Sequence, residues 1–580
     1  MKHTILLLDG PSRSYDPSFL SLFLTLREKC GTTIQATKRK LHSRKDNKCA
    51  AHGRARVVGP VASARRVKCD ETPGHCYNCS STGRTCEGYD PTPLPRPNTS
   101  QRHRGIYPHL PPTVTTEIRW LTTADERRCF AFFQSRTIPD ILGAFDSPLW
   151  HQLVLQIARL DPAVCHAAMA LAAVHQECQN TGMGLRPLEK HSPWNLFAYD
   201  QAARSFALLR RRNPRDPQVP QVVLLACILF VMLNLVWREY DAAFRHLRSG
   251  LRILGELHRQ GMPVFQNGQG SPVDWHIVTA LRQLDIQSTQ FGCDAPLLET
   301  REEARLAPTA AQWQTIRSVA EGRRALDPLT TLTHEYLKRG WSSEKERDPA
   351  RYASLHREQL ALISLLNQAK RAMHEFHIRQ YASLSPRDQV GADILKVNLH
   401  WLCLGLRAAF VLPGPAYLAS IASECHHILT TSEGVIAKLA PRRPAILFDT
   451  GIISPLFLVA SLSPEFSDRW RAILALHAWP HCEGPYSSAF HAHLAEKMLK
   501  GDLRARIRAE LTTARGKPPN PQLLEDQLAE RLTAITGRPE LQIDEEIEQY
   551  LDDLTQPMAG WPCAPLLIRA GVLSDRQFVP

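Results

Sequence analysis

The sequence of 580 residues has little of what marks an enzyme or a secreted protein. It contains no G-x-S-x-G motif, no P-loop and no G-x-G-x-x-G motif in a suitable context, so the common signatures of hydrolases and nucleotide-binding proteins are missing. The apolar run near the start, Ile5 to Leu8, ends at Asp9 and is too short for the core of a secretory signal. We therefore expect neither an enzyme nor a secreted protein.

Long hydrophobic runs are also scarce. One run, Val222 to Trp237, is 16 residues long, is interrupted by Asn234 and continues into charged sequence of helical pattern. A membrane crossing needs about 20 apolar residues. The run therefore predicts a buried helix, and we expect no membrane partner.

The sequence lacks alternating polar and apolar segments long enough to predict β-strands. From about Ile118 onward its apolar residues recur with helical spacing, and proline and glycine separate the periodic segments. This pattern predicts an all-α protein, with antiparallel helix pairs stacked around one core. The expected helices are 124–137, one opening at Ser147-Pro148, one opening at Asp161-Pro162, 193–212, 218–238, 240–259, 273–290, 311–338, 351–382, 390–411, 415–432, 467–478, 487–500, 522–535 and 542–555.

Positive charge is concentrated at the N-terminal end. The formal net charge is +13, and residues 1–90 carry 16 Lys and Arg against 8 Asp and Glu. Residues 1–64 show no clear periodicity, but Lys38-Arg39-Lys40 and Arg44-Lys45 have the character of a nuclear import signal. A solvated basic tail would show the same excess, whereas a polyanion partner such as nucleic acid would use it.

Four of the fifteen cysteines lie within 18 residues. They are spaced C-x6-C-x2-C-x6-C, and basic residues stand directly before the first one; the four are Cys69, Cys76, Cys79 and Cys86. A C-x2-C pair places two thiolates where both reach one ion, and zinc binds four thiolates tetrahedrally. The spacing therefore predicts a zinc site. The other cysteines are mostly single residues within helical segments, which suits free thiols in a reducing compartment.

The stretch RRVKCDETPGHCYNCSSTGRTCEGY, residues 65–89, resembles the second half of a fungal zinc binuclear cluster, the Zn2Cys6 DNA-binding module of transcription factors. The resemblance implies a nuclear, sequence-specific regulator of RNA polymerase II genes that binds double-stranded DNA at CGG-type triplets. It assigns Cys69, Cys76, Cys79 and Cys86 to zinc. Arg65, Arg66 and Lys68 take the place of the basic side chains that enter the major groove and donate to guanine.

The first half of that cluster is absent. The pattern requires cysteines at positions 59 and 62, where this chain has Gly59 and Ala62. Six cysteines hold two zinc ions only because two sulfurs bridge, so four cysteines fill at most one unbridged site, with His75 as a spare ligand. Two explanations stay open: residues 1–64 derive from a wrongly joined exon, or the cluster has decayed. In the second case the chain is a helical regulatory or interaction protein that has lost DNA binding.

We expect four segments: the basic segment 1–64, the partial cluster 65–89, a linker 90–117 and a helical domain 118–580. The linker contains seven prolines between Pro91 and Pro112, which predicts an extended spacer. No heptad pattern follows the cluster, so the sequence does not indicate an oligomeric state.

The helical part carries a second resemblance, on two stretches. Glu126 to Gln176 resembles the start of the fungal-specific transcription factor regulatory domain, with a Phe-rich helix, a Gly-x-Phe-Asp turn, a Trp helix and an acidic-Pro-Ala-Val helix. Arg469 to Leu499 resembles the late motif of that domain, around the turn Glu483-Gly484-Pro485-Tyr486. The resemblance implies packing and helix capping for these residues rather than chemistry.

Other clusters allow weaker predictions. His477, His481, His491 and His493, with Cys482, contain metal-ligand side chains but scatter over a turn and two helices, so packing is the favoured interpretation. His374-Glu375-Phe376-His377 is one residue short of the H-E-x-x-H zinc motif. Glu540 to Leu554 has seven acids, no Lys or Arg, and one apolar face. Such a helix either packs on its own domain or offers its apolar face to a coactivator.

Overall fold

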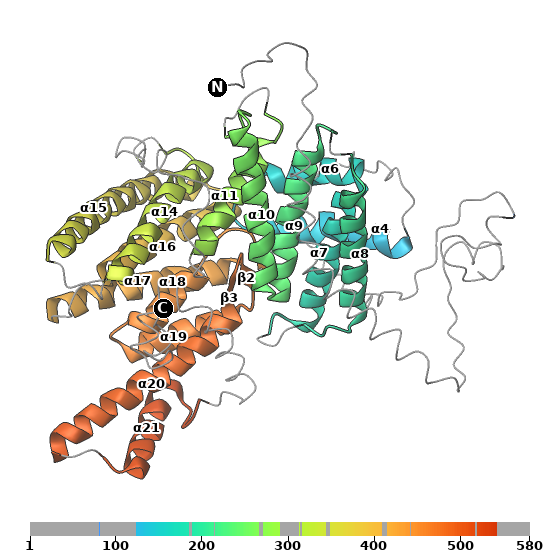
Figure 1. The fold of residues 1–580 in the computed structure, drawn as a ribbon. Helices are drawn as coiled ribbons and strands as arrows, with labels where there is room; N and C mark the ends of the chain where they lie inside the picture. The colour runs from blue at the N-terminus through green and yellow to red at the C-terminus, as the bar shows by residue number, and fades with distance from the viewer. Residues whose placement is uncertain are drawn as a thin grey trace, which may run out of the picture.

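A computed structural model describes residues 123–541, apart from 185–187, 214, 266–270, 290–312, 314–315, 344–348, 409–414, 441 and 517–518, together with Ser81. The basic segment, the linker and the cysteine cluster, Ser81 excepted, lie outside the described residues. So does the acidic segment after Leu541. Within the described part almost every element is a helix (Figure 1), and the predicted all-α class is confirmed.

The helices fall into two groups that follow one another along the chain. The first group consists of α4 (Ala124–Phe132), the π-helical turn η2 (Phe133–Thr137), α5 (Ile138–Leu142), the π-helical turn η3 (Leu149–Leu153), α6 (Val154–Leu160), α7 (Pro162–Thr181), α8 (Pro193–Arg210), α9 (Val219–Trp237), α10 (Tyr240–Arg259) and α11 (Trp275–Thr289).

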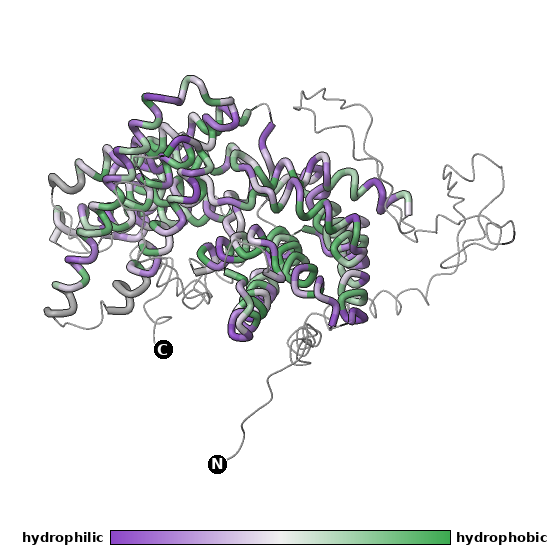
Figure 2. The backbone as a smooth tube through the Cα atoms, turned by 90° about the horizontal axis from the view of Figure 1, so that it is seen from above, coloured by the Kyte–Doolittle hydropathy of each residue, from purple (hydrophilic) through white to green (hydrophobic). Residues whose placement is uncertain are grey.

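The second group is coloured yellow to red in Figure 1. It consists of α14 (Val319–Ser343), α15 (Pro349–Gln380), the 3-10 turn η4 (Tyr381–Ser383), α16 (Pro386–Ala408), α17 (Pro415–Lys438), α18 (Ile453–Leu462), α19 (Phe466–Ala478), α20 (Ser488–Arg515) and α21 (Pro521–Thr536). Most of these helices carry both hydrophobic and hydrophilic positions (Figure 2), as amphipathic helices around a core must.

Several helices begin where the sequence predicts a start, because a side-chain oxygen accepts a hydrogen bond from a free backbone N–H of the first turn. Asp161 caps α7, with Pro162 as its first residue, and Ser192 caps α8 in front of Pro193. Thr123 and Glu126 form a reciprocal capping box at the start of α4. The Phe-rich segment therefore starts abruptly at Ala124.

The hydrophobic core is divided, and the prediction of one core was wrong. One cluster of buried side chains belongs to the helices before residue 290, and a second cluster belongs to the helices after 312. A few residues pack into the cluster of the other half of the chain. Ile446, Phe448 and Cys482 pack into the first cluster, and Phe145 packs into the second. This chain is too long to fold around one hydrophobic core, because single cores stop growing at roughly 250–300 residues.

The apolar run forms α9, which lies inside the first cluster as predicted. Among the described helices it is the one long and apolar enough to cross a membrane, and 94% of its apolar window is buried inside the fold. α7 and α10 pack against it. Burial by neighbouring helices on all sides explains why the run is hydrophobic all round rather than striped.

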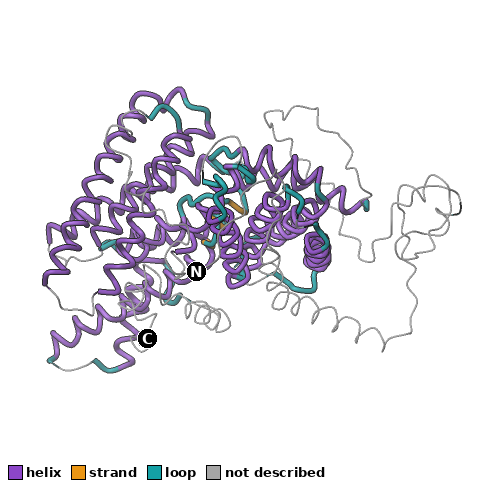
Figure 3. The backbone as a smooth tube through the Cα atoms, turned by 45° about the horizontal axis from the view of Figure 1, so that its top comes forward, coloured by secondary structure: helices purple, strands orange, loops and turns teal. Residues whose placement is uncertain are grey.

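A small sheet and one helix were not predicted. β1 (Ile446–Leu447) pairs in parallel with β2 (Cys482–Glu483), and β2 pairs antiparallel with β3 (Tyr486–Ser487). Figure 3 places these strands between the two helical groups. Two-residue strands are too short to show alternation. α18 was missed because its ten residues are mostly apolar and show no helical stripe.

Several helix boundaries also differ from the prediction; α17, for example, ends at Lys438 rather than at residue 432. α14 runs from Val319 to Ser343 rather than over 311–338, and α20 continues to Arg515 instead of ending at residue 500. The added turns of α20 form ion pairs with α21, including Arg504 with Glu525. Leu503, Ile507 and Leu511 recur every four residues in this stretch, so the helical signal was present in the sequence and was missed.

Candidate functional site

The residues assigned to zinc and DNA, which are Cys69, Cys76, Cys79, Cys86, Arg65, Arg66 and Lys68, lie outside the described residues, so both assignments stay predictions. The cysteines that the structure describes do not have the character of metal ligands. Cys129, Cys165, Cys178, Cys227, Cys403, Cys425 and Cys482 are all buried free thiols. Burial raises the pKa of Cys227 and Cys425 to about 12. These thiols are therefore protonated and serve as core packing.

The late-motif turn joins the strands to the N-terminus of α18. Glu483 is fully buried, and its carboxylate accepts hydrogen bonds from the backbone N–H groups of Gly451 (2.8 Å), Ile452 (2.8 Å) and Ile453 (3.1 Å). These groups are the unpaired donors at the start of α18, where the helix dipole also favours a negative charge. Nε2 of His481 lies 3.0 Å from the same carboxylate. Glu483 therefore caps a helix, as the sequence resemblance implied.

The glycine of this turn brings the two helical groups together. Gly484 has φ +53°, and its backbone N–H donates to the carbonyl of Leu447 at 2.8 Å. Gln287 of α11 lies where a Cβ at position 484 would stand, and its side-chain amide donates to the carbonyl of Phe448 at 3.0 Å. A larger residue at 484 would displace this amide.

A polar cluster lies at the same junction. The Asp449 carboxylate accepts from Gln283 of α11 at 2.5 Å and from Nε of Arg323 of α14 at 2.7 Å. Arg323 also pairs with Asp327, and its guanidinium lies 5.8 Å from the centroid of Phe145. The two carboxylates raise the pKa of Arg323 against the effect of burial. Asp449 therefore joins the first helical group to the second.

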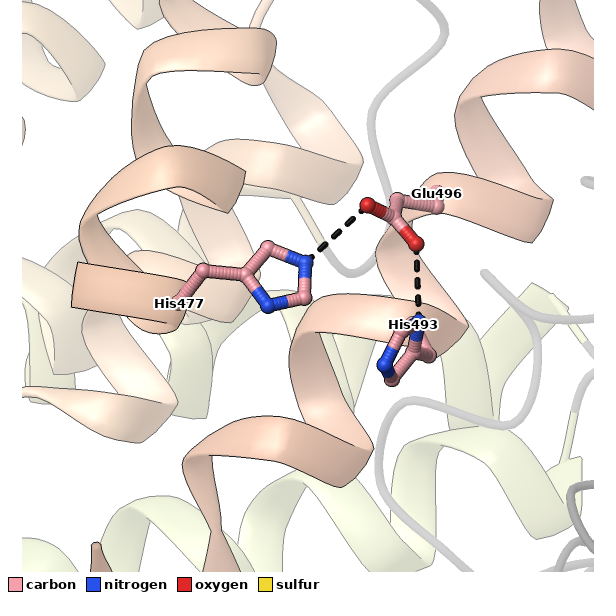
Figure 4. A group of neighbouring side chains, drawn as sticks. All are labelled: His477, His493 and Glu496. Atoms are coloured by element: carbon pink, nitrogen blue, oxygen red, sulfur yellow. Dashed lines mark hydrogen bonds and ion pairs between the residues drawn. The ribbon is translucent and has the colours of Figure 1, made fainter. Parts of the chain in front are cut away.

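The four histidines near the late motif do not converge. His477 of α19 and His493 of α20 approach Glu496 (Figure 4): Nε2 of His477 lies 3.0 Å from one carboxylate oxygen, and Nδ1 of His493 lies 2.9 Å from the other. His481 and His491 are buried elsewhere. His481 lies next to the Glu483 carboxylate, and His491 lies next to the Ser487 carbonyl.

The His477–Glu496–His493 group contains three metal-ligand side chains whose ligand atoms lie within 4.8 Å of one another. The carboxylate stands between the two rings, and each of its oxygens is already paired with one ring nitrogen. Although burial opposes ionisation, the hydrogen bonds from both rings lower the pKa of Glu496 to about 2. A metal ion would have to replace the protons that join the two rings to this carboxylate. The three side chains are already paired with one another without an ion, so the geometry is that of a hydrogen-bonded contact between α19 and α20.

The two histidines of the segment His374-Glu375-Phe376-His377 on α15, which resembles the H-E-x-x-H motif, also point to different surroundings. Nε2 of His377 lies 3.5 Å from Asp393, and its ring stacks on Tyr381 with centroids 5.0 Å apart. His374 is exposed and faces a different surface, the pocket described next. The two rings therefore do not share a ligand position, in line with their spacing.

A basic pocket of about 390 Å³ lies among α15, α16 and α17. Its lining, here called the basic pocket, is Asn367, Lys370, Arg371, Met373, His374, Lys396, Leu399, His400 and His427. Lys370 and His400 contact the Glu424 carboxylate at 2.6 and 2.8 Å, and these contacts lower the pKa of Glu424 to about 2 despite its burial.

Sequence analysis missed this pocket. Lys370, Arg371 and His374 lie on one helix, Lys396 and His400 on the next, and His427 on a third, at spacings of three and four residues. The recurrence of basic residues and histidines on one face of each helix was the only sign of the pocket in the sequence. It is indistinguishable from a solvated helix face until the three helices are placed side by side.

Comparison with known proteins gives two related regulators. The chain is 28% identical over 277 residues to the aspercryptin biosynthesis cluster-specific transcription regulator atnN of Emericella nidulans, covering 43% of this chain and 42% of that protein. It is 27% identical over 203 residues to the transcription regulator lscL of Purpureocillium lilacinum, covering 33% of this chain and 47% of that protein. The matches thus span less than half the length of each relative. No family model and no solved structure matches the chain.

Proposed function

We propose that this chain is a nuclear transcription regulator that binds DNA through residues 65–89 and exerts regulation through its helical domain. The similarity to two curated fungal transcription regulators is the observation that carries the proposal. The basic N-terminal end and the cysteine cluster support it from the sequence. The described cysteines add a contrast: all are buried core thiols, whereas Cys76 and Cys79 have the C-x2-C spacing of a metal site.

The DNA-binding step is proposed in its finer form as zinc-dependent recognition of CGG-type triplets in RNA polymerase II genes. Cys69, Cys76, Cys79 and Cys86 provide four thiolates, a donor set that fits one tetrahedral zinc ion but not two without further ligands. Zinc, when bound, would supply folding free energy to a segment too small and polar to form a core.

The basic residues directly before the first cysteine perform the recognition. Arg65, Arg66 and Lys68 would donate to guanine O6 and N7 in the major groove, once their helix is held in place. Without that anchorage they would give only salt-sensitive affinity for phosphates.

The test restores the missing ligands. We compare the full chain with Gly59→Cys/Ala62→Cys and with a control, Gly53→Cys/Ala55→Cys, that adds two cysteines at the wrong spacing. The original chain is expected to bind no more than one zinc ion per molecule. The restored variant is expected to bind two and to prefer CGG-containing over scrambled duplexes. An original chain that binds two zinc ions and discriminates CGG would contradict the proposed defect.

A second candidate function rests on Gly59 and Ala62, which stand where the cluster requires cysteines. On this hypothesis the chain is a helical regulatory protein that has lost DNA binding. It predicts that the original chain binds neither zinc nor CGG duplexes, while its helical domain folds normally. Sequencing the transcript over the codons for residues 40–70 decides whether a different exon supplies the missing cysteines.

The acidic segment Glu540 to Leu554 supports a further part of the proposal, an activation surface for a coactivator. Its apolar side would consist of Ile543, Ile547, Tyr550, Leu551 and Leu554. Substituting Ile547 and Leu551 by serine should lower activation of a reporter gene without changing DNA binding. An unchanged reporter response would leave this segment as ordinary packing sequence.

A further inference from the structure

The basic pocket differs from an ordinary charged surface in its lining. Its floor includes Met373 and Leu399, which are both about 1% exposed. One wall consists of two imidazoles, His400 and His427, whose ring centroids are 4.5 Å apart. A pocket of about 390 Å³ falls within the usual range for small-molecule sites, which are concave and mostly apolar with a few polar groups.

Two of the cations around this pocket have no ion-pair partner among the described residues. Lys370 is paired with Glu424. Lys396 is half-buried and Arg371 is exposed, and neither forms an ion pair or a side-chain hydrogen bond with the described residues. Burial lowers the pKa of Lys396, and Asp393 opposes this only in part. A half-buried ammonium without a close anion is unfavourable, and a bound anion would compensate it.

An unused polar atom lies in the same lining. Nε2 of His427 is buried and makes no hydrogen bond with the described residues. Burial, with the nearby His400 and Lys396, lowers the pKa of His427 to about 4. The ring is therefore neutral at pH 7, and it adds an uncharged aromatic face to the lining rather than a further cation.

We propose that the basic pocket binds a small organic anion, a carboxylate or phosphate ester with an apolar or aromatic body. Lys396 and Arg371 would contact the anionic group, and the apolar body would lie against the imidazole rings of His400 and His427. A free inorganic anion would leave the imidazole wall without a contact, and a neutral ligand would leave the cations uncompensated. The anion site is additional to the proposed DNA-binding function. The binding test described next does not require the chain to bind DNA.

The test measures binding of small probes to the full-length chain by calorimetry. The probes are 1-naphthylacetate, octanoate and phenyl phosphate, with neutral 1-naphthylacetamide as the shape-matched control. We expect saturable binding of at least one anion at one site per chain, and at least about ten-fold weaker binding of the amide, because the charge-assisted hydrogen bonds are lost.

Variants locate the site. Lys396→Met keeps the apolar stem and is expected to weaken anion binding about ten-fold or more, and Lys396→Glu is expected to abolish it. Lys500→Met is the matched control, because Lys500 is also half-buried, lies on α20 away from the pocket and forms no ion pair among the described residues. Thermal unfolding checks that each variant is folded. Failure of all three anions to bind at millimolar concentration would overturn the proposal, as would equal binding of acid and amide or unchanged binding by folded Lys396→Met.

Discussion

Glu483 and Gly451 are matched to one another at the start of α18. The Gly451 backbone N–H donates to the Glu483 carboxylate at 2.8 Å, and a Cβ at position 451 would collide with that carboxylate. Glu483 is fully buried and satisfies two more backbone donors. The acid and the glycine thus form one unit, which fixes the turn between β2 and β3 against the helix that follows β1.

Gly451→Ala should therefore destabilise the helical domain by about 2 kcal/mol, because the added methyl group forces the carboxylate away from its donors. Glu483→Ala should cost at least about 3 kcal/mol, because it leaves three buried N–H groups unpaired. Denaturant unfolding measures both. Gly255→Ala is the control: its Cβ would meet nothing within 4 Å, and it lies within α10, so it should be stabilising by up to about 1 kcal/mol. Equal effects at positions 451 and 255 would contradict the matched pair.

The ion pair between Arg323 and Asp449 should stabilise the junction of the two helical groups, where Asp449 also contacts Gln283 of α11. The side chains of Arg323 and Asp449 are both 17% exposed. Asp449→Ala should destabilise the fold by about 3 kcal/mol, because it leaves a largely buried guanidinium with one partner fewer. In a double-mutant cycle with Arg323→Met, the second substitution should cost much less once the first is present.

The control for that cycle is Glu525→Ala on α21, which breaks an ion pair with Arg504 whose side chains are 48% and 43% exposed. It should change the free energy of unfolding by less than about 1 kcal/mol. Additive effects of the Arg323 and Asp449 substitutions would show that this ion pair does not contribute to the stability of the fold.

His246 should make the stability depend on pH. It lies against Phe206 and Phe230, and burial lowers its pKa from 6.5 to about 4. Below pH 6.5 the unfolded chain binds a proton that the folded chain refuses, so the stability contributed by the neutral ring is full above pH 6.5 and is lost as the pH falls toward 4. At pH 5 this loss amounts to about 2 kcal/mol.

His246→Phe should remove that part of the pH dependence, so the variant should lose about 2 kcal/mol less than the original chain between pH 7 and pH 5. Denaturant unfolding at both pH values measures the difference. The exposed His191, replaced by Phe, is the control and should leave the pH dependence unchanged. Buried His334 and His491, whose pKa values burial also lowers to about 4, add to the same trend in the original chain.

The proline-rich segment 90–116 should be the first site of limited proteolysis. It has few large apolar side chains, so we expect few contacts with the helical domain. Cleavage there should release a stable fragment beginning near residue 118, identified by mass spectrometry. A chain that resists cleavage there while it is cut within the helices would contradict separate modules.

Much of the helical framework was predictable, because caps and hydrophobic periods act over a few residues. Asp161 before Pro162 and Ser192 before Pro193 mark helix starts in the sequence alone. α18 and the three short strands were not, because α18 is too uniformly apolar to show a helical stripe and strands of two residues are too short to show alternation. The start of α18 depends on a distant partner, because Ile453 donates to Glu483, 30 residues further along the chain.

The sequence by itself determined that the chain is all-α, that Val222 to Trp237 forms a buried helix, and that a cysteine cluster with two positions unfilled precedes the helical part. These features depend on residue type and local spacing. Only the tertiary structure decided that the core is divided, that the His477 and His493 rings share Glu496, and that Lys396, Arg371 and His427 surround one pocket. Such groups come from different helices, and helix packing rather than any local pattern brings their side chains together.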